Sequence, residues 1–123
     1  MKTSNSLLIN LSNHPLSSWP TEQREAALRY GTTIDMDFPS IPPSASEEDI
    51  DQLAHQYLHL IINQKKDNEL TVHIMGEMTF TFAVVNLLKA HNIPCIASCT
   101  ERVVEEIEGK KISEFHFRKF RKY

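Results

Sequence analysis

Glycine is scarce in this chain, and its scarcity excludes two common nucleotide-binding loops. Only three glycines occur among the 123 residues: Gly31, Gly76 and Gly109. The phosphate loop of ATP and GTP enzymes and the glycine-rich fingerprint for dinucleotides both need closely spaced glycines, so neither can be present. Ordinary ATP and NAD chemistry is therefore not expected, and the sequence predicts no cofactor.

Cysteine and long apolar runs are scarce as well. Cys95 and Cys99 are the only two cysteines, and their spacing suits neither a zinc knuckle nor a disulfide framework, so we expect reduced thiols. The apolar run from Leu7 to Leu11 is interrupted by Asn10 and is too short for a signal segment or a membrane span. We expect a cytoplasmic protein with no membrane contact.

Charge is unevenly distributed along the chain. The net charge is -3, yet residues 110 to 123 carry six basic residues against Glu114, a local charge of +5, which leaves -8 on the rest. An acidic body disfavours long nucleic acid as a partner. The basic segment has two interpretations: it binds a small anion, or its charges keep a strand edge from aggregating.

Up to residue 97 the chain alternates predicted strands and helices. Ser46 is a helix N-cap that precedes apolar residues recurring at every third and fourth position, and Thr21 and Thr79 are candidate N-caps of two further helices. Such alternation predicts parallel strands with helices on both faces of one sheet. The predicted strands cover residues 6–11, 32–37, 70–75 and 95–97, and the predicted helices cover residues 21–30, 46–62 and 79–88.

The C-terminal part changes character. Gly109 and Lys110 separate residues 103–108 from residues 112–120, and Phe115 alternates with Phe117 as strand residues do, which predicts a terminal β-hairpin. A helix through residues 103–108 is the alternative. We expect a single domain over residues 1–123, in which only the proline-rich segment 39–43 could serve as a hinge or lid.

Polar clusters follow the predicted strands. In a parallel sheet the carboxyl ends of the strands meet at one edge, where ligands bind, so these clusters should converge. Backbone N–H groups at the helix starts near Thr21 and Thr79 could hold a phosphate there. The clusters are Asn13 with His14, Gly76 with Glu77 and Thr79, and Ser98 with Thr100 and Arg102.

Several single residues in and near these clusters or on the predicted helices have to be weighed one by one. His14 lies in a loop. The unperturbed pKa of histidine side chains is about 6.5, which suits proton transfer at neutral pH. The alternative is that His14 is a structural histidine. Trp19 could stack on an adenine base or form the edge of the core. His55 and His59 have metal-ligand spacing but lie on the polar side of their predicted helix, so no metal site is predicted.

Several short segments resemble one known family. The chain resembles the small stand-alone ring nucleases of type III CRISPR antiviral defence, which are similar to the CARF group of Rossmann-like cyclic-oligoadenylate binders. The resemblance runs from the first strand to the last residue. The segments that carry it are Asn13-His14 with Gln23, Ile41-Pro42-Pro43, Gly76-Glu77-Met78-Thr79, Ser98-Cys99-Thr100-Glu101-Arg102 with Glu106, and Phe120-Arg121-Lys122-Tyr123.

This resemblance implies a single Rossmann-like, CARF-like α/β domain with a mainly parallel sheet. It implies a homodimer that binds cyclic tetra-adenylate and cleaves it without a metal, through attack of a ribose 2′-hydroxyl on the adjacent phosphorus. The implied catalytic residues are His14 and Arg102. The implied ligand-binding residues are Asn13, Trp19, Gln23, Gly76, Glu77, Thr79 and Thr100.

Two positions depart from the family's pattern. Glu77 stands where the strand exit is expected to carry aspartate, and Cys99 stands where threonine is expected. Because a hydroxyl is lost at Cys99, one alternative stays open: a sponge or sensor that binds the messenger without cleaving it. The basic C-terminal segment suggests another, a regulatory partner of a larger effector.

Overall fold

The computed structural model describes residues 5–123, so Met1 and the polar start of the N-terminal segment lie outside the described residues. Its core is a five-stranded sheet in the order β2-β1-β3-β4-β5. The strands are β1 (Ser6–Ser12), β2 (Thr32–Asp37), β3 (Glu69–Met75), β4 (Cys95–Ile107) and β5 (Lys110–Lys122); the helices are α1 (Thr21–Ala27), α2 (Glu47–Lys65) and α3 (Met78–Ala90), with 3-10 turns η1 (Leu16–Ser18) and η2 (Leu28–Tyr30).

The sheet is mixed, which corrects the expectation of a mainly parallel sheet. Strands β2, β1, β3 and β4 run parallel to one another, whereas β5 runs antiparallel to β4. Parallel β3 and β4 pair only at Val72 with Cys95 and at His73 with Ile96. The antiparallel pairing of β4 with β5 extends from Ile96 to Ile107. Much of the strand pairing in the sheet therefore lies in the C-terminal hairpin.

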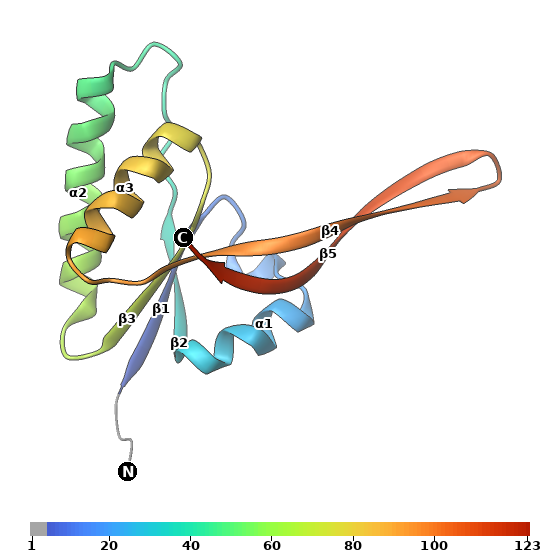
Figure 1. Ribbon diagram of the computed structural model, residues 1–123, viewed down its shortest axis with the longest axis horizontal. Coiled ribbons are helices and arrows are strands. Elements are labelled where there is room, and N and C mark those ends of the chain that lie inside the picture. The colour runs from blue at the N-terminus through green and yellow to red at the C-terminus, as the bar shows by residue number, and fades with distance from the viewer. Residues whose placement is uncertain (1–4) are drawn as a thin grey trace.

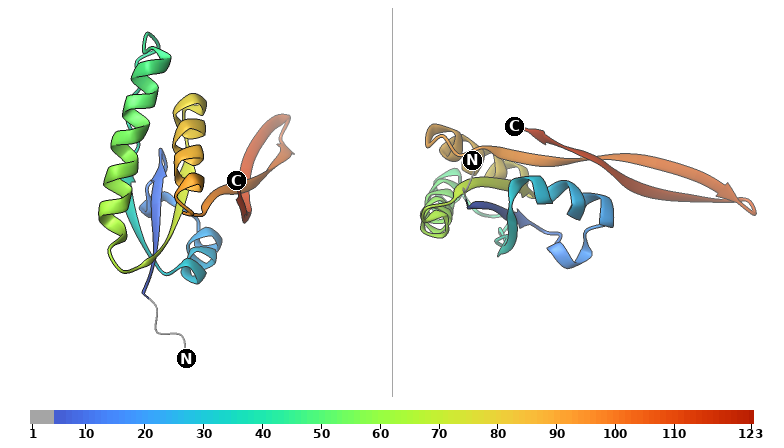
Figure 2. Two further views of the ribbon diagram at one scale, coloured as in Figure 1. Left: turned by 60° about the vertical axis from the view of Figure 1, so that its left-hand side comes forward. Right: turned by 90° about the horizontal axis from the view of Figure 1, so that it is seen from below.

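Helices cover both faces of the sheet, as the alternation of elements predicted. Helices α2 and α3 lie on one face and α1 lies on the other (Figure 2). Successive strand residues point to opposite faces, and in β1 both sets are buried. Leu7, Ile9 and Leu11 pack toward α2 and α3, while Leu8 packs with Trp19 and Ala27 on the α1 side.

Of the three N-cap residues predicted from the sequence, one is confirmed. Ser46 caps α2 through a capping box with Asp49, because each side chain satisfies the other residue's free backbone N–H. Thr21 is the first residue of α1, preceded by Pro20 with no side-chain cap. Thr79 lies inside α3, whose N-cap is Glu77. The predicted helix 21–30 ends at Ala27 and continues only as the turn η2.

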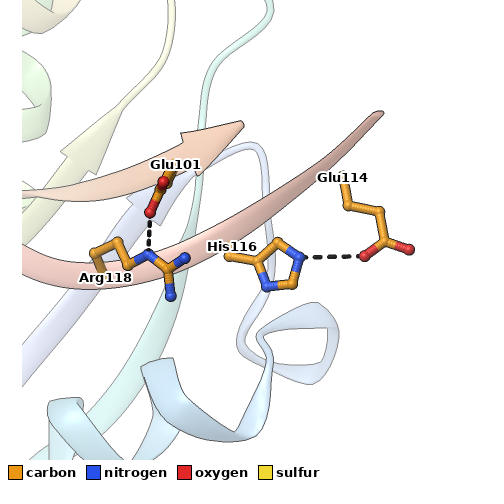
Figure 3. A network of polar contacts seen from close by, with 4 residues as sticks. All are labelled: Glu101, Glu114, His116 and Arg118. Atoms are coloured by element: carbon orange, nitrogen blue, oxygen red, sulfur yellow. Dashed lines mark hydrogen bonds and ion pairs between the residues drawn. The ribbon is translucent and has the colours of Figure 1, made fainter. Parts of the chain in front are cut away.

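Strands β4 and β5 form a long hairpin that projects from the body of the molecule (Figure 1). Residues 100–117 of this hairpin are called the arm below. Residues 103–107 are part of β4, so the strand alternative is confirmed and the helical alternative is wrong. Ion pairs of Arg118 with Glu101 and of His116 with Glu114 link side chains of the hairpin (Figure 3), but exposed pairs of this kind add little stability.

Candidate functional site

A pocket of about 350 Å³ lies at the carboxyl ends of β1 and β3 and beside the first half of β4, on the side covered by α1. The chain leaves β1 toward α1 on one face of the sheet and leaves β3 toward α3 on the other face. Diverging connections of this kind open a crevice at the strand ends, where α/β sheets bind ligands. The lining residues are Ser12, His14, Ser18, Trp19, Pro20, Gln23, His73, Met75, Ser98, Thr100 and Phe115.

A chain of hydrogen bonds runs beneath this pocket from β1 through β3 to β4. Nδ1 of His73 lies 2.9 Å from Oδ1 of Asn10, and Nε2 of His73 lies 2.7 Å from Oγ of Ser98. Nε2 of Gln23 donates to the same Oγ at 3.0 Å. Asn10 and His73 are almost fully buried, with 1% and 2% of their surface exposed, so polar groups join three neighbouring strands inside the core.

The direction of each hydrogen bond follows from the amide of Asn10. Its Nδ2 donates to the backbone oxygen of His14 at 2.8 Å and to Oδ1 of Asp35 at 2.9 Å, so its Oδ1 must be the acceptor. His73 therefore carries its proton on Nδ1, and Nε2 is the acceptor. Because Nε2 of His73 carries no proton, the Ser98 hydroxyl donates to it, while the Ser98 oxygen accepts the hydrogen bond from Gln23.

Burial holds His73 in the neutral form. Desolvation, with a smaller contribution from nearby His14, lowers the pKa of His73 from 6.5 to about 4. A buried imidazole loses hydration on becoming charged, and a second imidazole close by opposes the same charge. At neutral pH, Nε2 of His73 is thus an unprotonated acceptor facing the Ser98 hydroxyl.

His14 lies at the rim of the pocket with its side chain exposed. Its backbone is held firmly: the carbonyl oxygen accepts hydrogen bonds from Asn10 and from Nε1 of Trp19 at 2.9 Å, and its N–H donates to Oγ of Ser12 at 3.2 Å. These bonds fix the loop after β1 and leave the imidazole exposed at the rim of the pocket.

The pocket gathers some of the residues predicted for the site. His14, Trp19, Gln23 and Thr100 line it. Trp19 is only 3% exposed and packs edge-on against His73 at a ring-centroid distance of 5.1 Å. Its indole is a wall of the core, so in this arrangement its ring is not open for stacking on a base.

Other predicted residues lie elsewhere. Asn13 borders a separate hollow beside Asp35 and Asp37, whose carboxylates make a poor phosphate site. Gly76 borders an apolar hollow next to Tyr123. The three strand-end clusters thus do not converge on a single cavity.

The start of α3 is already occupied by a carboxylate. Glu77 accepts hydrogen bonds from the backbone N–H of Phe80 at 2.7 Å and from the hydroxyl of Thr79 at 2.7 Å. These bonds lower the pKa of Glu77, the Phe80 N–H contributing most. An internal carboxylate thus already occupies the start of α3, near Thr79, where the sequence led us to expect a phosphate.

Arg102 lies on the arm, beyond the pocket. Its Nη2 and Nε donate to Oγ of Ser113 at 2.9 Å and 3.3 Å. By strand alternation it faces the same side as Ser98 and Thr100, about 7 Å beyond Thr100. Its strand partner is Phe115, which lines the pocket, so the guanidinium lies on the same face as the pocket mouth rather than within the pocket.

The described part of the chain contains neither a metal-binding cluster nor a membrane-spanning helix. Residues 5–123 contain no group of three or more His, Cys, Asp or Glu side chains that could hold a metal ion. Both cysteines are free thiols, as expected. Among these residues no helix has the length and apolar character needed to cross a membrane.

The comparisons with known proteins give one match. The model of the uncharacterized protein MJ1673 family matches residues 6–121, nearly the whole chain. This chain belongs to the MJ1673 family. No curated protein and no solved structure matches it at a significant level. The family description states no activity, so the chemistry rests on the pocket.

The sequence-based prediction for this MJ1673-family chain missed the centre of the polar network. Asn10 and His73 were not among the predicted site residues, and Ser98 was noted only as part of a strand-end cluster. The available signal was one polar residue inside each of two apolar strands, Asn10 in β1 and His73 in β3. These two positions are Cα partners in the parallel ladder, a pairing that is visible only once the strand order is known.

Proposed function

We propose that this MJ1673-family protein is a ring nuclease that binds cyclic oligoadenylate, preferentially cyclic tetra-adenylate, and cleaves it to end type III CRISPR signalling. The observation that carries the proposal is the pocket at the strand ends, where exposed His14 lies beside a neutral network of hydroxyl, imidazole and amide groups. The sequence resemblance to CARF-like ring nucleases supplies the substrate class. The parallel part of the sheet, with order β2-β1-β3-β4 and helices on both faces, agrees with a Rossmann-like fold.

The chemistry of the pocket suits a ribose better than a phosphate. None of its lining residues is Lys, Arg, Asp or Glu, whereas Ser18, Gln23, Ser98 and Thr100 offer polar groups to hydroxyls. We place a ribose in the pocket and its phosphate at the mouth, on the face that carries Arg102. A guanidinium there would form charge-assisted hydrogen bonds with phosphate oxygens.

A homodimer follows from the size of the ligand. A pocket of about 350 Å³ lies at the small end of ligand sites and cannot enclose four nucleotides. A two-fold axis through a cyclic tetranucleotide would give it two equal sets of contacts. The exposed side chains of Met78 and Phe82, which are 83% and 70% exposed, border the apolar hollow beside Tyr123 and offer a surface for a second copy.

The proposed reaction needs alignment and proton transfer. The ribose 2′-oxygen attacks the adjacent phosphorus, the bond from phosphorus to the 5′-oxygen breaks, and the products are a 2′,3′-cyclic phosphate and a 5′-hydroxyl. One proton leaves the 2′-hydroxyl and one reaches the 5′-oxygen. His14 serves one of these transfers, Arg102 stabilises charge on the phosphate, and Gln23 and Thr100 orient the ribose.

The test is to incubate the purified protein, in EDTA, with radiolabelled cyclic tri-, tetra- and hexa-adenylate and to separate the products by chromatography. Cleavage of cyclic tetra-adenylate to linear products ending in 2′,3′-cyclic phosphate is expected. An electrophoretic shift assay run on the same mixtures measures binding separately. A protein that neither binds nor cleaves any ring would overturn the proposal.

The second candidate is a sponge that binds the ring and releases it unchanged. It is favoured by the absence of a charged residue from the pocket lining, because phosphate charge would then be met only outside the pocket. The loss of a hydroxyl at Cys99 does not favour it, since strand alternation directs Cys99 to the face opposite Ser98 and Thr100. Binding without product would identify the sponge.

A further inference from the structure

Ser98 and His73 form a pair that the reaction described above does not use. The hydroxyl of Ser98 donates to Nε2 of His73 at 2.7 Å, and Nδ1 of His73 donates to Asn10 at 2.9 Å. A hydroxyl, an imidazole and an orienting acceptor in this sequence are the parts with which enzymes draw a proton from an oxygen. Here they come from three adjacent strands, so the sheet itself holds their geometry.

The position of Ser98 distinguishes this chain of groups from a closed structural network. Asn10 and His73 are buried, whereas Ser98 is half-buried and lines the pocket. Its hydroxyl thus contacts the imidazole on one side and is open to a ligand on the other. Gln23 holds the same oxygen from α1 with a hydrogen bond of 3.0 Å, which fixes its position relative to the cavity.

The tautomer of His73 is set for one direction of transfer. Asn10 cannot turn its amide without losing the hydrogen bonds that its Nδ2 donates to Asp35 and to the His14 carbonyl. Its Oδ1 therefore keeps the proton of His73 on Nδ1 and leaves Nε2 free to accept. After Nε2 takes a proton, Oδ1 of Asn10 still accepts the Nδ1 proton of the imidazolium, so the same bond serves both states.

We propose that Ser98 and His73 are the proton acceptor for the substrate's attacking hydroxyl, with Ser98 Oγ as the atom that touches it; this inference rests on the proposed function. As the ribose 2′-oxygen bonds to phosphorus, its proton passes to Ser98 Oγ, and the Ser98 proton passes to Nε2 of His73. Ser98 ends the step as a neutral hydroxyl and His73 as an imidazolium. His14 then has the other role and protonates the departing 5′-oxygen. The proton then returns from His73 through the Ser98 hydroxyl to the pocket, which resets the site.

The test compares Ser98→Ala with Ser98→Thr, which restores a hydroxyl on the same strand. Single-turnover cleavage of cyclic tetra-adenylate should slow about 100-fold in Ser98→Ala, with its dissociation constant unchanged within about threefold. Ser98→Thr should recover most of the rate. Ser40→Ala, at an exposed position, is the control, and unfolding temperatures confirm that all variants are folded at the assay temperature.

A second readout separates a proton relay from a structural role. In mixtures of light and heavy water, the wild-type rate should curve with the deuterium fraction because two protons move together, and Ser98→Ala should give a straight line. If Ser98→Ala cleaves at the wild-type rate, the relay is overturned and the proposed function stays intact. Absence of cleavage by the wild-type protein would overturn the proposed cleavage and the relay with it.

Discussion

The Oγ atom of Ser98 lies 2.7 Å from Nε2 of His73, and this contact joins β4 to β3 just beyond the point where the two strands stop pairing. The last paired positions are His73 and Ile96. Past them, the backbone N–H of Ser98 faces the sulfur of Met75 at 3.2 Å instead of a strand carbonyl. The opening between the strands therefore coincides with the pocket, and side-chain bonds replace the ladder there.

The lowered pKa of His73 predicts a specific loss of stability in acid. The pKa of His73 is about 4 in the folded protein, and its ordinary value of 6.5 applies to the unfolded chain. As pH falls, the unfolded chain therefore binds a proton at this site before the folded protein does. The stability from neutral His73 is complete above pH 6.5 and decreases between pH 6.5 and 4, by at most about 3 kcal/mol. Urea unfolding at several pH values in this range measures it.

Two variants make the stability experiment decisive. His73→Gln removes the titrating group, so its free energy of unfolding should depend less on pH than that of the wild type over the same window. His55→Gln changes an exposed histidine and should keep the wild-type slope. If the wild type and His73→Gln had the same slope, burial of His73 would not govern its protonation.

Two glycines with positive φ predict unequal costs of adding a methyl group. A Cβ at Gly31 would lie 2.1 Å from the backbone oxygen of Ser6, whereas a Cβ at Gly109 would meet nothing within 4 Å. Both residues have left-handed φ values, 105° and 77°, so both substitutions carry backbone strain of about 1 kcal/mol. Only Gly31→Ala must also displace the start of β1.

Gly109→Ala should lower the free energy of unfolding by about 1 kcal/mol, the cost of the backbone strain. Gly31→Ala should lower it by considerably more. Chemical denaturation of the two variants beside the wild type measures the difference. Equal losses would mean that the close approach of Gly31 to β1 is relieved by a small movement of the loop.

Arg102 is predicted to contribute to ligand binding from outside the pocket. A charge-assisted hydrogen bond to phosphate contributes about 1.5–3 kcal/mol, so Arg102→Ala should weaken binding of cyclic tetra-adenylate by roughly 10- to 100-fold. Arg118→Ala is the matched control, because Arg118 is also an exposed arginine of the hairpin and pairs with Glu101. Fluorescence anisotropy at fixed salt measures both dissociation constants, and equal values would remove Arg102 from the site.

His14 is predicted to act on the rate of cleavage more than on binding. Removing a proton-transferring side chain slows a reaction by about 10² to 10⁴-fold, so His14→Ala should cleave cyclic tetra-adenylate that much more slowly and bind it nearly as before. His59→Ala, at an exposed position on α2, serves as the control. A His14→Ala protein with the wild-type single-turnover rate would end its catalytic role.

Local patterns were sufficient to predict many of the elements of this fold. The alternation of apolar strands with amphipathic helices predicted β1, α2, β2 and β3 close to their observed bounds. The capping box at Ser46 and Asp49 was readable because its two partners lie three residues apart. These predictions succeeded because the interactions that form such elements join residues close together in the sequence.

The C-terminal part needed more than local pattern. Phe115 and Phe117 indicated a hairpin, but residues 95–97 and 103–108 were read as separate segments, although residues 95–107 form one continuous strand of 13 residues. Residues 98–102 between them carry polar side chains, which usually mark a loop. Here pairing with β5 extends over this segment, so a polar segment remains a strand.

The sequence by itself determined the α/β alternation, the strand ends where polar residues gather and the placement of His14 in the loop after β1. Only the tertiary structure decided which of those residues share a cavity. It brought Asn10, His73 and Ser98 together, although 63 residues separate Asn10 from His73 and 25 separate His73 from Ser98, and it left Asn13, Gly76 and Arg102 outside the pocket. The physical reason is that helix and strand periodicity arise from neighbours along the chain, whereas strand order and the direction of each connection are set by packing across the whole core.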